Sequence, residues 1–144
     1  HAKCFAMATM VRGEPKALCV PIARYDHKEK WAWGEMEAVW EDLRTLYQAN
    51  PRVVMHNAVF DCQWLWRYGV EVEEVYMDTM LAFHTLYPEL PKDLGTVAML
   101  YTDMPYFKGA HKAQGEELWR YNCLDCIATL RASYKLEEEL CTLA

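Results

Sequence analysis

Apolar residues recur at helical spacing in one long segment and cluster in shorter runs on either side of it. From Glu35 onward they return every three or four positions until Asn50-Pro51, which predicts an amphipathic helix. Upstream, residues 3–11 and 16–23 are rich in apolar side chains and flank Arg12-Gly13-Glu14-Pro15, which predicts a β-hairpin with its turn at these four residues. The polar and aromatic stretch 25–34 predicts a loop.

A second group of elements follows the long helix. Residues 52–56 are short and β-branched, which predicts a buried strand, and residues 59–68 predict a helix. Gly69 then occupies the position where a left-handed residue commonly ends a helix. Val70, Val72 and Val75 alternate with acidic residues, which predicts a short, half-exposed strand.

The last third of the chain is predicted to be helical. Asp78 is placed to cap a helix over 79–87, which Pro88 halts, and a short helix is predicted over 94–101. After a loop over 102–115, a long helix is predicted over 116–140. A hairpin followed by alternating helices and strands predicts an α/β layered domain, and 144 residues suffice for one domain with its own core.

Composition narrows the classes of protein that fit. The chain is 53% hydrophobic and 25% charged, as soluble globular proteins are, and no apolar run approaches the roughly 18 to 20 residues of a membrane span. No segment has the pattern of a signal peptide. The net charge of −6 argues against a module that grips duplex nucleic acid through a basic face, but it allows a carboxylate site that divalent metal ions neutralise.

The six cysteines are dispersed through predicted strands and helices. We interpret them as free, buried thiols in a reducing compartment. Cys123-x-x-Cys126 is the spacing of zinc and redox sites, but no second pair at zinc spacing accompanies it and it lies inside a helix rather than at its start. Packing is therefore the favoured role of this pair.

Two short motifs carry candidate chemistry. Asp61, in Asn57-Ala58-Val59-Phe60-Asp61, follows a predicted strand, and open α/β sheets place their sites beyond the carboxyl ends of strands. Tyr121 and Asp125 lie four residues apart in a predicted helix, so the phenol and the carboxylate share one face. Two carboxylates and a phenol suit a metal-dependent nuclease.

The order Asn-x-x-Phe-Asp followed by Tyr-x-x-x-Asp resembles the second and third exonuclease motifs of the DEDD superfamily, in its tyrosine-type branch. The intervening Asp78-Thr79-Met80, the segments 86–94 and 105–108, and Tyr101-Thr102 are similar to phage-type proofreading 3′–5′ exonuclease domains of family A DNA polymerases. The resemblance covers essentially the whole chain. It implies a ribonuclease H-like exonuclease fold, in which a mixed sheet is flanked by helices.

The resemblance also implies roles for individual residues. Asp61 and Asp125 would bind metal, as two Mg²⁺ or Mn²⁺ ions do in the intact family, and Tyr121 would orient the attacking water. Asn57 and Phe60 would contact the substrate. The implied substrate is a single-stranded DNA 3′ end, hydrolysed to nucleoside 5′-monophosphates, and the implied partner is a polymerase domain on the parent chain. The expected location is the cytoplasm of a bacterium or of a phage-infected cell.

The family's first motif, an Asp-x-Glu on the opening central strand, has no counterpart here. The earliest acidic residue is Glu14, in the predicted turn, without an acidic residue two positions before it. We therefore expect residues 1–144 to be an N-terminally incomplete exonuclease domain or a degenerate member, with the first central strand lacking and activity weak or absent. The alternatives are a catalytically inactive exonuclease-fold module within a polymerase and an RNA exonuclease of the ribonuclease D type.

Each candidate residue also has a purely structural interpretation. Asp61 would be an acid in the first turn of a helix, Tyr121 and Phe60 would be core aromatics, and Asn57 would cap a strand end. Asp78 is interpreted as a helix cap. His56, His84 and His111 show no spacing typical of metal ligands and are interpreted as structural or surface residues. One of Trp64, Trp66 or Trp119 could stack on a base.

Overall fold

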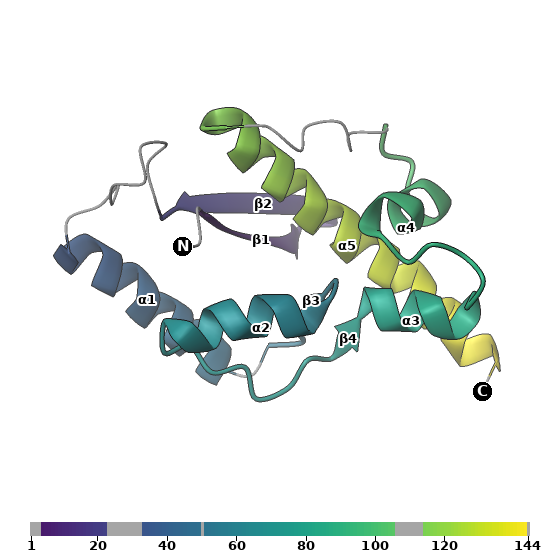
Figure 1. The fold of residues 1–144 in the computed structure, drawn as a ribbon, viewed down its shortest axis with the longest axis horizontal. Helices are drawn as coiled ribbons and strands as arrows, with labels where there is room; N and C mark the ends of the chain where they lie inside the picture. Colours follow the sequence, from purple (N-terminus) through teal and green to yellow (C-terminus); the bar gives the residue numbers. More distant parts are fainter. Residues whose placement is uncertain (1–3, 23–32, 50, 106–113, 144) are drawn as a thin grey trace.

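A computed structural model gives the architecture of the chain and describes residues 4–22, 33–49, 51–105 and 114–143. Within these residues, two short sheets lie among five helices (Figure 1). The elements are β1 (Cys4–Val11), β2 (Glu14–Pro21), α1 (Trp33–Gln48), β3 (Val54–Met55), α2 (Ala58–Arg67), β4 (Met77–Asp78), α3 (Thr79–Leu86), α4 (Leu94–Tyr101) and α5 (Glu116–Leu143). The α/β class and the order of the elements agree with the sequence.

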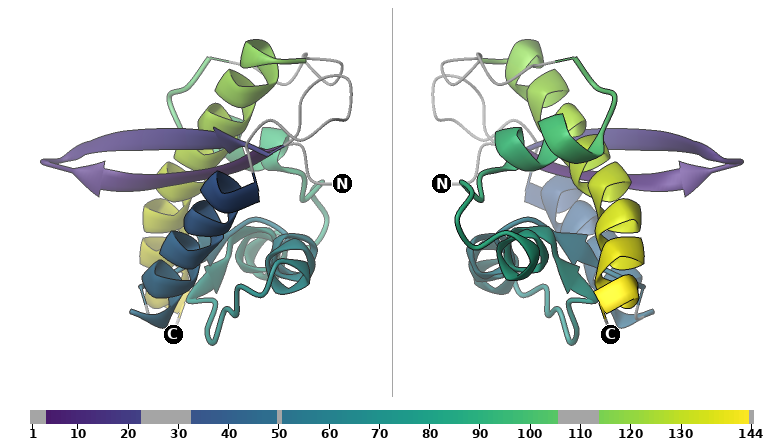
Figure 2. Two further views of the ribbon diagram at one scale, coloured as in Figure 1. Left: turned by 90° about the vertical axis from the view of Figure 1, so that its left-hand side faces the viewer. Right: turned by 90° about the vertical axis from the view of Figure 1, so that its right-hand side faces the viewer.

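The predicted hairpin is confirmed, with a tighter turn than expected. β1 and β2 pair antiparallel from Cys4 with Pro21 to Val11 with Glu14, so only Arg12 and Gly13 form the turn. Both have positive φ, 53° and 82°, which is the type I′ geometry that matches the twist of two strands. Glu14 and Pro15 therefore belong to β2, not to the turn. Figure 2 shows the hairpin reaching beyond α5, with its turn clear of the helices.

The predicted single mixed sheet is not present among the described residues. β1 pairs with β2, β3 pairs in parallel with β4, and these two sheets are separate. The strand predicted over 52–56 is reduced to Val54–Met55, whose partners are Met77 and Asp78. A two-residue pairing buries little backbone, so neighbouring side chains must fix these strands in place.

Helix α2 ends as predicted, but the strand expected after it does not form. Gly69 has φ 72°, and the amides of Gly69 and Val70 donate to the carbonyls of Trp66 and Leu65 at 3.0 Å each, a Schellman motif. Residues 70–76 are then irregular. Val70 is fully buried against the core beside Leu65, so its place is set by the end of the helix and not by a sheet.

One core cluster joins α1, α2 and β3. Its buried residues are Trp40, Leu43, Met55, Ala58, Cys62, Leu65 and Val70. The helical spacing predicted from Glu35 onward holds, with Leu46 as an exposed exception at 41%. Helix α1 begins at Trp33, so residues 33 and 34 are helical where a loop was expected; the rest of that loop lies outside the described residues.

A second core cluster joins α3, α4 and α5 through Ala82, Phe83, Val97, Tyr101, Ala132 and Leu136. The buried residues of α5 are mostly small, among them Ala128, Thr129, Ala132 and Ser133. Small side chains allow other elements to approach closely, and α5 contacts both strands of the hairpin as well as α3, α4 and β3. Helix α5 therefore connects the two clusters. Among the described residues, no helix is long and apolar enough to cross a membrane.

Candidate functional site

The motif that contains Asp61 begins where β3 ends. After Met55 the chain turns through Asn57, which has φ 64° and ψ 59°, and α2 starts at Ala58. This is the left-handed region, in which asparagine is among the few residues other than glycine that occur often. Asp61 lies in the first turn of α2. The predicted position of Asp61, just beyond a strand, is confirmed.

The backbone of this turn is held by Asp78. The amides of Asn57 and Ala58 donate to the two oxygens of the Asp78 carboxylate at 3.0 and 2.8 Å. The amide of Met80 also donates to Asp78, at 2.9 Å, which confirms the predicted cap of α3. One carboxylate thus joins the starts of two helices.

Thr79 and His56 add a second link between the same segments. The buried Thr79 hydroxyl donates to the Met55 carbonyl at 3.2 Å and lies 2.9 Å from His56 Nδ1. The tautomer of His56 decides which of the two groups, Nδ1 or the Thr79 hydroxyl, is the donor in this contact. His56 is thereby tied to the end of β3, in agreement with its structural interpretation.

Asp61 keeps contact with solvent, yet protein atoms crowd its carboxylate. Partial burial, and then the negative charge of Asp78, raise the pKa of Asp61 to about 6. Tyr47 of α1 lies near: burial raises its pKa to about 12, and the charge of Asp61 adds to the shift. Asp61 therefore occupies a place where negative charge is unfavourable unless a cation accompanies it.

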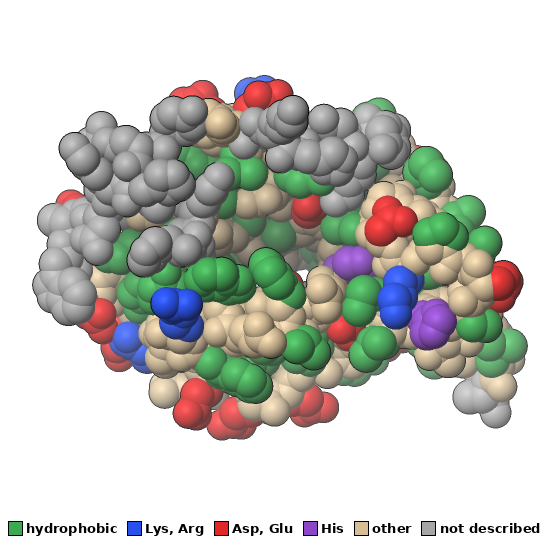
Figure 3. All heavy atoms as spheres, in the orientation of Figure 1, with side chains coloured by type: hydrophobic (Ala, Val, Ile, Leu, Met, Phe, Trp, Pro, Cys, Tyr) green, Lys and Arg blue, Asp and Glu red, His purple; other side chains and the backbone are tan. Residues whose placement is uncertain are grey.

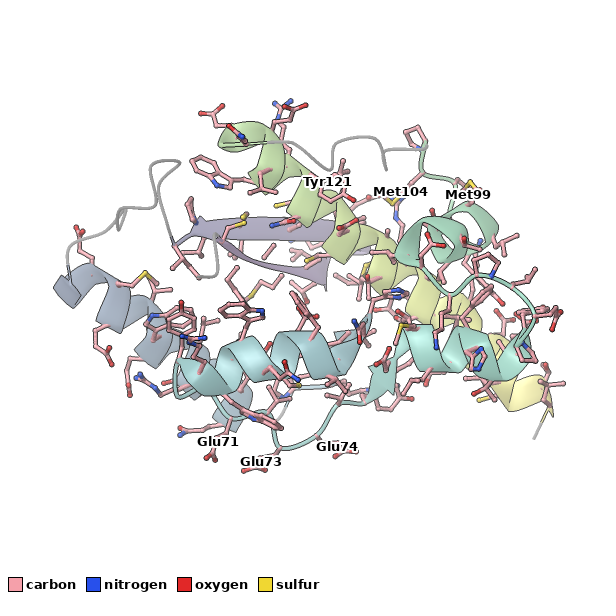
Figure 4. The ribbon with its side chains drawn as sticks, viewed as in Figure 1. Glu71, Glu73, Glu74, Met99, Met104 and Tyr121 are labelled. Atoms are coloured by element: carbon pink, nitrogen blue, oxygen red, sulfur yellow. The ribbon has the colours of Figure 1, made fainter. Side chains whose placement is uncertain are left out.

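Tyr121 and Asp125 lie one turn apart on α5, and both are half-buried. The neighbouring thiol of Cys126 shows how Asp125 and Asp61 are related. Burial raises the pKa of Cys126 to about 12, and the charges of Asp125 and Asp61 contribute to the rise. The charges of both carboxylates therefore raise the pKa of the same thiol on α5, although Asp61 and Asp125 are 64 positions apart in the sequence. Figure 4 shows Tyr121 on the side of α5 that faces the segment carrying Met104.

The structure gives no complete metal site around the predicted ligands Asp61 and Asp125 within the residues that it describes. Within the described ranges, no three His, Cys, Asp or Glu side chains gather closely enough to hold an ion. The donor chemistry nevertheless fits, since Asp61 and Asp125 offer the carboxylate oxygens that Mg²⁺ and Mn²⁺ prefer. A separation of about 4 to 8 Å between these carboxylates stays a prediction.

The two residues predicted to contact substrate lie at the surface beside Asp61. Asn57 is exposed and makes no side-chain capping bond, and Phe60 is 58% exposed, next to Val59 at 66%. Phe60 is therefore not a core aromatic, because its position in the first turn of α2 faces away from the cluster that buries Cys62 and Leu65. Figure 3 shows hydrophobic side chains over α2 at the edge of a hollow in this face.

Two features of the site were not predicted from the sequence. Asp78 was identified as a cap, but its bonds to Asn57 and Ala58 cross 20 residues or more, and no local pattern encodes them. Cys126 is next to Asp125 in the sequence, but its nearness to Asp61 follows from the packing of α5. The six cysteines, all within the described ranges, form no disulfide, as predicted, but only Cys62 is buried and Cys141 is exposed.

Comparison with known proteins gives one informative match. The chain is 37% identical over 98 residues to DNA polymerase I of Synechocystis sp., in a match that covers 60% of this chain and 10% of that protein. This chain is related to part of a DNA polymerase. It spans about a tenth of the length of that relative. No protein-family model matches the chain, and no solved structure is significantly similar to it.

Proposed function

We propose that this chain is a 3′–5′ exonuclease domain of the tyrosine-type DEDD class and that it works beside a polymerase domain. The observation that carries the proposal is the placement of the two motifs, since Asp61 lies in the first turn of α2 just beyond β3 and Tyr121 and Asp125 lie one turn apart on α5. The match to a DNA polymerase I supports the same context. The proposed substrate is the 3′ end of single-stranded DNA.

Each candidate residue would have its own role in the hydrolysis. Asp61 and Asp125 would hold Mg²⁺ or Mn²⁺ together with carboxylates of an Asp-x-Glu motif on a further strand. When bound, such ions supply charge neutralisation and activate water. Tyr121 would donate a hydrogen bond that orients the attacking water. Exposed Phe60 and Asn57 would hold the terminal nucleotide by stacking and hydrogen bonding. Hydrolysis breaks the bond between phosphorus and the 3′ oxygen and releases a nucleoside 5′-monophosphate.

The alternative is a catalytically inactive exonuclease-fold module that contributes shape and contacts to a polymerase. An RNA exonuclease of the ribonuclease D type shares the motifs and differs in the polymer it degrades. Activity and polymer preference separate the three functions.

The deciding experiment assays the release of mononucleotides from 3′-labelled single strands in Mn²⁺. The chain is tested alone and with an Asp-x-Glu strand fused ahead of residue 1. The fused form is expected to release mononucleotides from DNA in preference to RNA, and Asp125→Ala is expected to abolish the release, whereas Asp42→Ala on the exposed surface of α1 leaves it unchanged. Release that persists in Asp125→Ala with the metal chelated contradicts the mechanism. Preference for RNA favours the ribonuclease D type, and a fused form without activity favours the inactive module.

A further inference from the structure

Asp78 differs from an ordinary helix cap in the number of segments that it binds. Asp93 offers the comparison within this chain: it caps α4 by accepting from the amide and the hydroxyl of Thr96, at 3.1 and 2.7 Å, and both groups belong to its own helix. Asp78 accepts from Met80 of its own helix and also from Asn57 and Ala58 at the start of α2. Asp78 is thus a cap and a bridge.

The register of the short parallel sheet places Asp78 for this task. β3 and β4 lie side by side (Figure 1), and Asp78 is paired with Met55, the last residue of β3, so its carboxylate reaches the turn that follows. The hydroxyl of Thr79 supports the same junction through the Met55 carbonyl. The end of β3 is therefore tied to the start of α3 by side chains as well as by backbone pairing.

The hydrogen bonds to Asp78 stabilise the turn between β3 and α2. Asn57 is in a left-handed conformation, which asparagine adopts more readily than most residues other than glycine but which neighbouring contacts still stabilise. Its own side chain makes no capping bond, so the stabilising groups include the two Asp78 oxygens that its amide and that of Ala58 contact. The direction in which α2 leaves β3 depends on this turn, and Asp61 lies one helical turn further on.

We propose that Asp78 is the positioning residue for Asp61: by clamping the amides of Asn57 and Ala58, it fixes the start of α2 and hence the place of the Asp61 carboxylate. A catalytic role of this positioning rests on the proposed function, whereas the clamp itself is given by the hydrogen bonds from Asn57 and Ala58 to Asp78. Asp78 and Asp61 therefore have different tasks. The oxygens of Asp78 are occupied by three backbone amides, and Asp61 is left to bind a cation.

The test uses serine substitutions, because serine still caps a helix but is too short to bridge two segments. In Asp78→Ser the amides of Asn57 and Ala58 are expected to exchange with solvent about tenfold faster or more, since each loses its acceptor. Titration with Mn²⁺ is expected to broaden the amide resonance of Asp61 at lower metal concentration in the parent than in Asp78→Ser. The matched control, Asp93→Ser, changes neither readout.

A second variant covers the case in which Asp78→Ser does not fold. Glycine adopts the left-handed turn without support, so Asn57→Gly combined with Asp78→Ser is expected to fold and to recover most of the Mn²⁺ response at Asp61. Unchanged exchange at Asn57 and Ala58 in Asp78→Ser overturns the clamp, and an unchanged Mn²⁺ response in that variant overturns the positioning role. If Mn²⁺ does not affect Asp61 in the parent or in the fused form, the proposed function fails, and the exchange rates alone decide whether the clamp exists.

Discussion

At the scale of single residues, the chemistry of this chain centres on Asp61. The sequence places Asp61 beyond a strand and in the first turn of a helix, and both placements hold. The electrostatic surroundings of Asp61 could not be predicted from the sequence. Asp78 is 17 residues away along the chain and is brought near Asp61 by a two-residue strand pairing. A carboxylate whose pKa is raised first by burial and then by a neighbouring carboxylate is typical of functional sites.

The first prediction concerns the pH dependence of stability. The pKa of Asp61 is raised from 3.8 to about 6, so between these values the folded chain holds a proton that the unfolded chain releases. Stability contributed by Asp61 therefore falls as pH rises through this window. Asp61→Asn is expected to gain stability relative to the parent between pH 4 and pH 7, by about 1 kcal/mol or less because the side chain retains solvent contact. Urea unfolding at several pH values measures the difference.

The matched control is Glu73→Gln, since Glu73 is exposed in the irregular segment before β4 and points away from the body of the molecule (Figure 4). It is expected to show no such trend with pH. A constant difference between Asp61→Asn and the parent from pH 4 to pH 7 would mean that the carboxylate of Asp61 is not perturbed.

The second prediction separates two phenylalanines. Phe60 is 58% exposed and Phe83 is fully buried. Phe83→Ala is expected to destabilise the chain by about 3 to 5 kcal/mol, whereas Phe60→Ala is expected to cost well under about 1 kcal/mol. If Phe60 stacks on a base, Phe60→Ala weakens the binding of single-stranded DNA by about 1 to 3 kcal/mol. Thermal unfolding and fluorescence anisotropy with a labelled oligonucleotide give the two values, and a large loss of stability in Phe60→Ala would contradict its surface position.

At the scale of elements, periodicity predicted the helices better than the strands. Helix α4 has the predicted bounds and α1 differs by two residues at its start, because a repeating apolar face and end signals such as Asn50-Pro51 and Gly69 are local features. The pattern at Val70, Val72 and Val75 suggested a strand but reflects side chains that pack on a core from an irregular segment. Strand pairing depends on partners far along the chain, so β3 and β4 could not be delimited from sequence.

The third prediction tests how α5 is fastened to α3 and α4. The Glu139 carboxylate accepts hydrogen bonds from the phenols of Tyr87 and Tyr101, and these bonds lower the pKa of Glu139 below 4.5. A depressed pKa contributes stability at neutral pH that is lost as pH falls through the acid range. Glu139→Gln is expected to lower Tm by a few degrees at pH 7, because the amide replaces one of the two accepting oxygens by a donor and removes the negative charge that strengthens both hydrogen bonds.

Calorimetry of Glu139→Gln beside Glu138→Gln provides the comparison, since Glu138 is an exposed neighbour on the same helix. The Tm difference between the two variants should shrink towards pH 3. Equal Tm values for both variants at pH 7 would show that the two phenols do not hold α5.

At the scale of the whole molecule, α5 joins two core clusters and two separate sheets. The hairpin lies against α5 near its base, whereas Thr9, Met10, Val11 and the turn are exposed. In the described part of the chain neither outer edge of this hairpin is paired with another strand. An isolated two-stranded sheet is marginally stable, and an unpaired edge is a surface to which another strand can be added.

The last prediction follows from this arrangement and concerns hydrogen exchange across the molecule. Amides of residues 9–14, at the far end of the hairpin, are expected to exchange much faster than those of residues 128–136, which lie in the buried middle of α5. Fusing a strand ahead of residue 1 should slow exchange in β1 if the strand pairs there, because each new bond protects an amide. The measurement is made on material shown by sedimentation to be monomeric, since pairing between copies would also protect the edge. Strong and uniform protection of both hairpin strands in the unfused monomer would show that the edges are already covered, and that no strand with an Asp-x-Glu motif is accommodated beside β1.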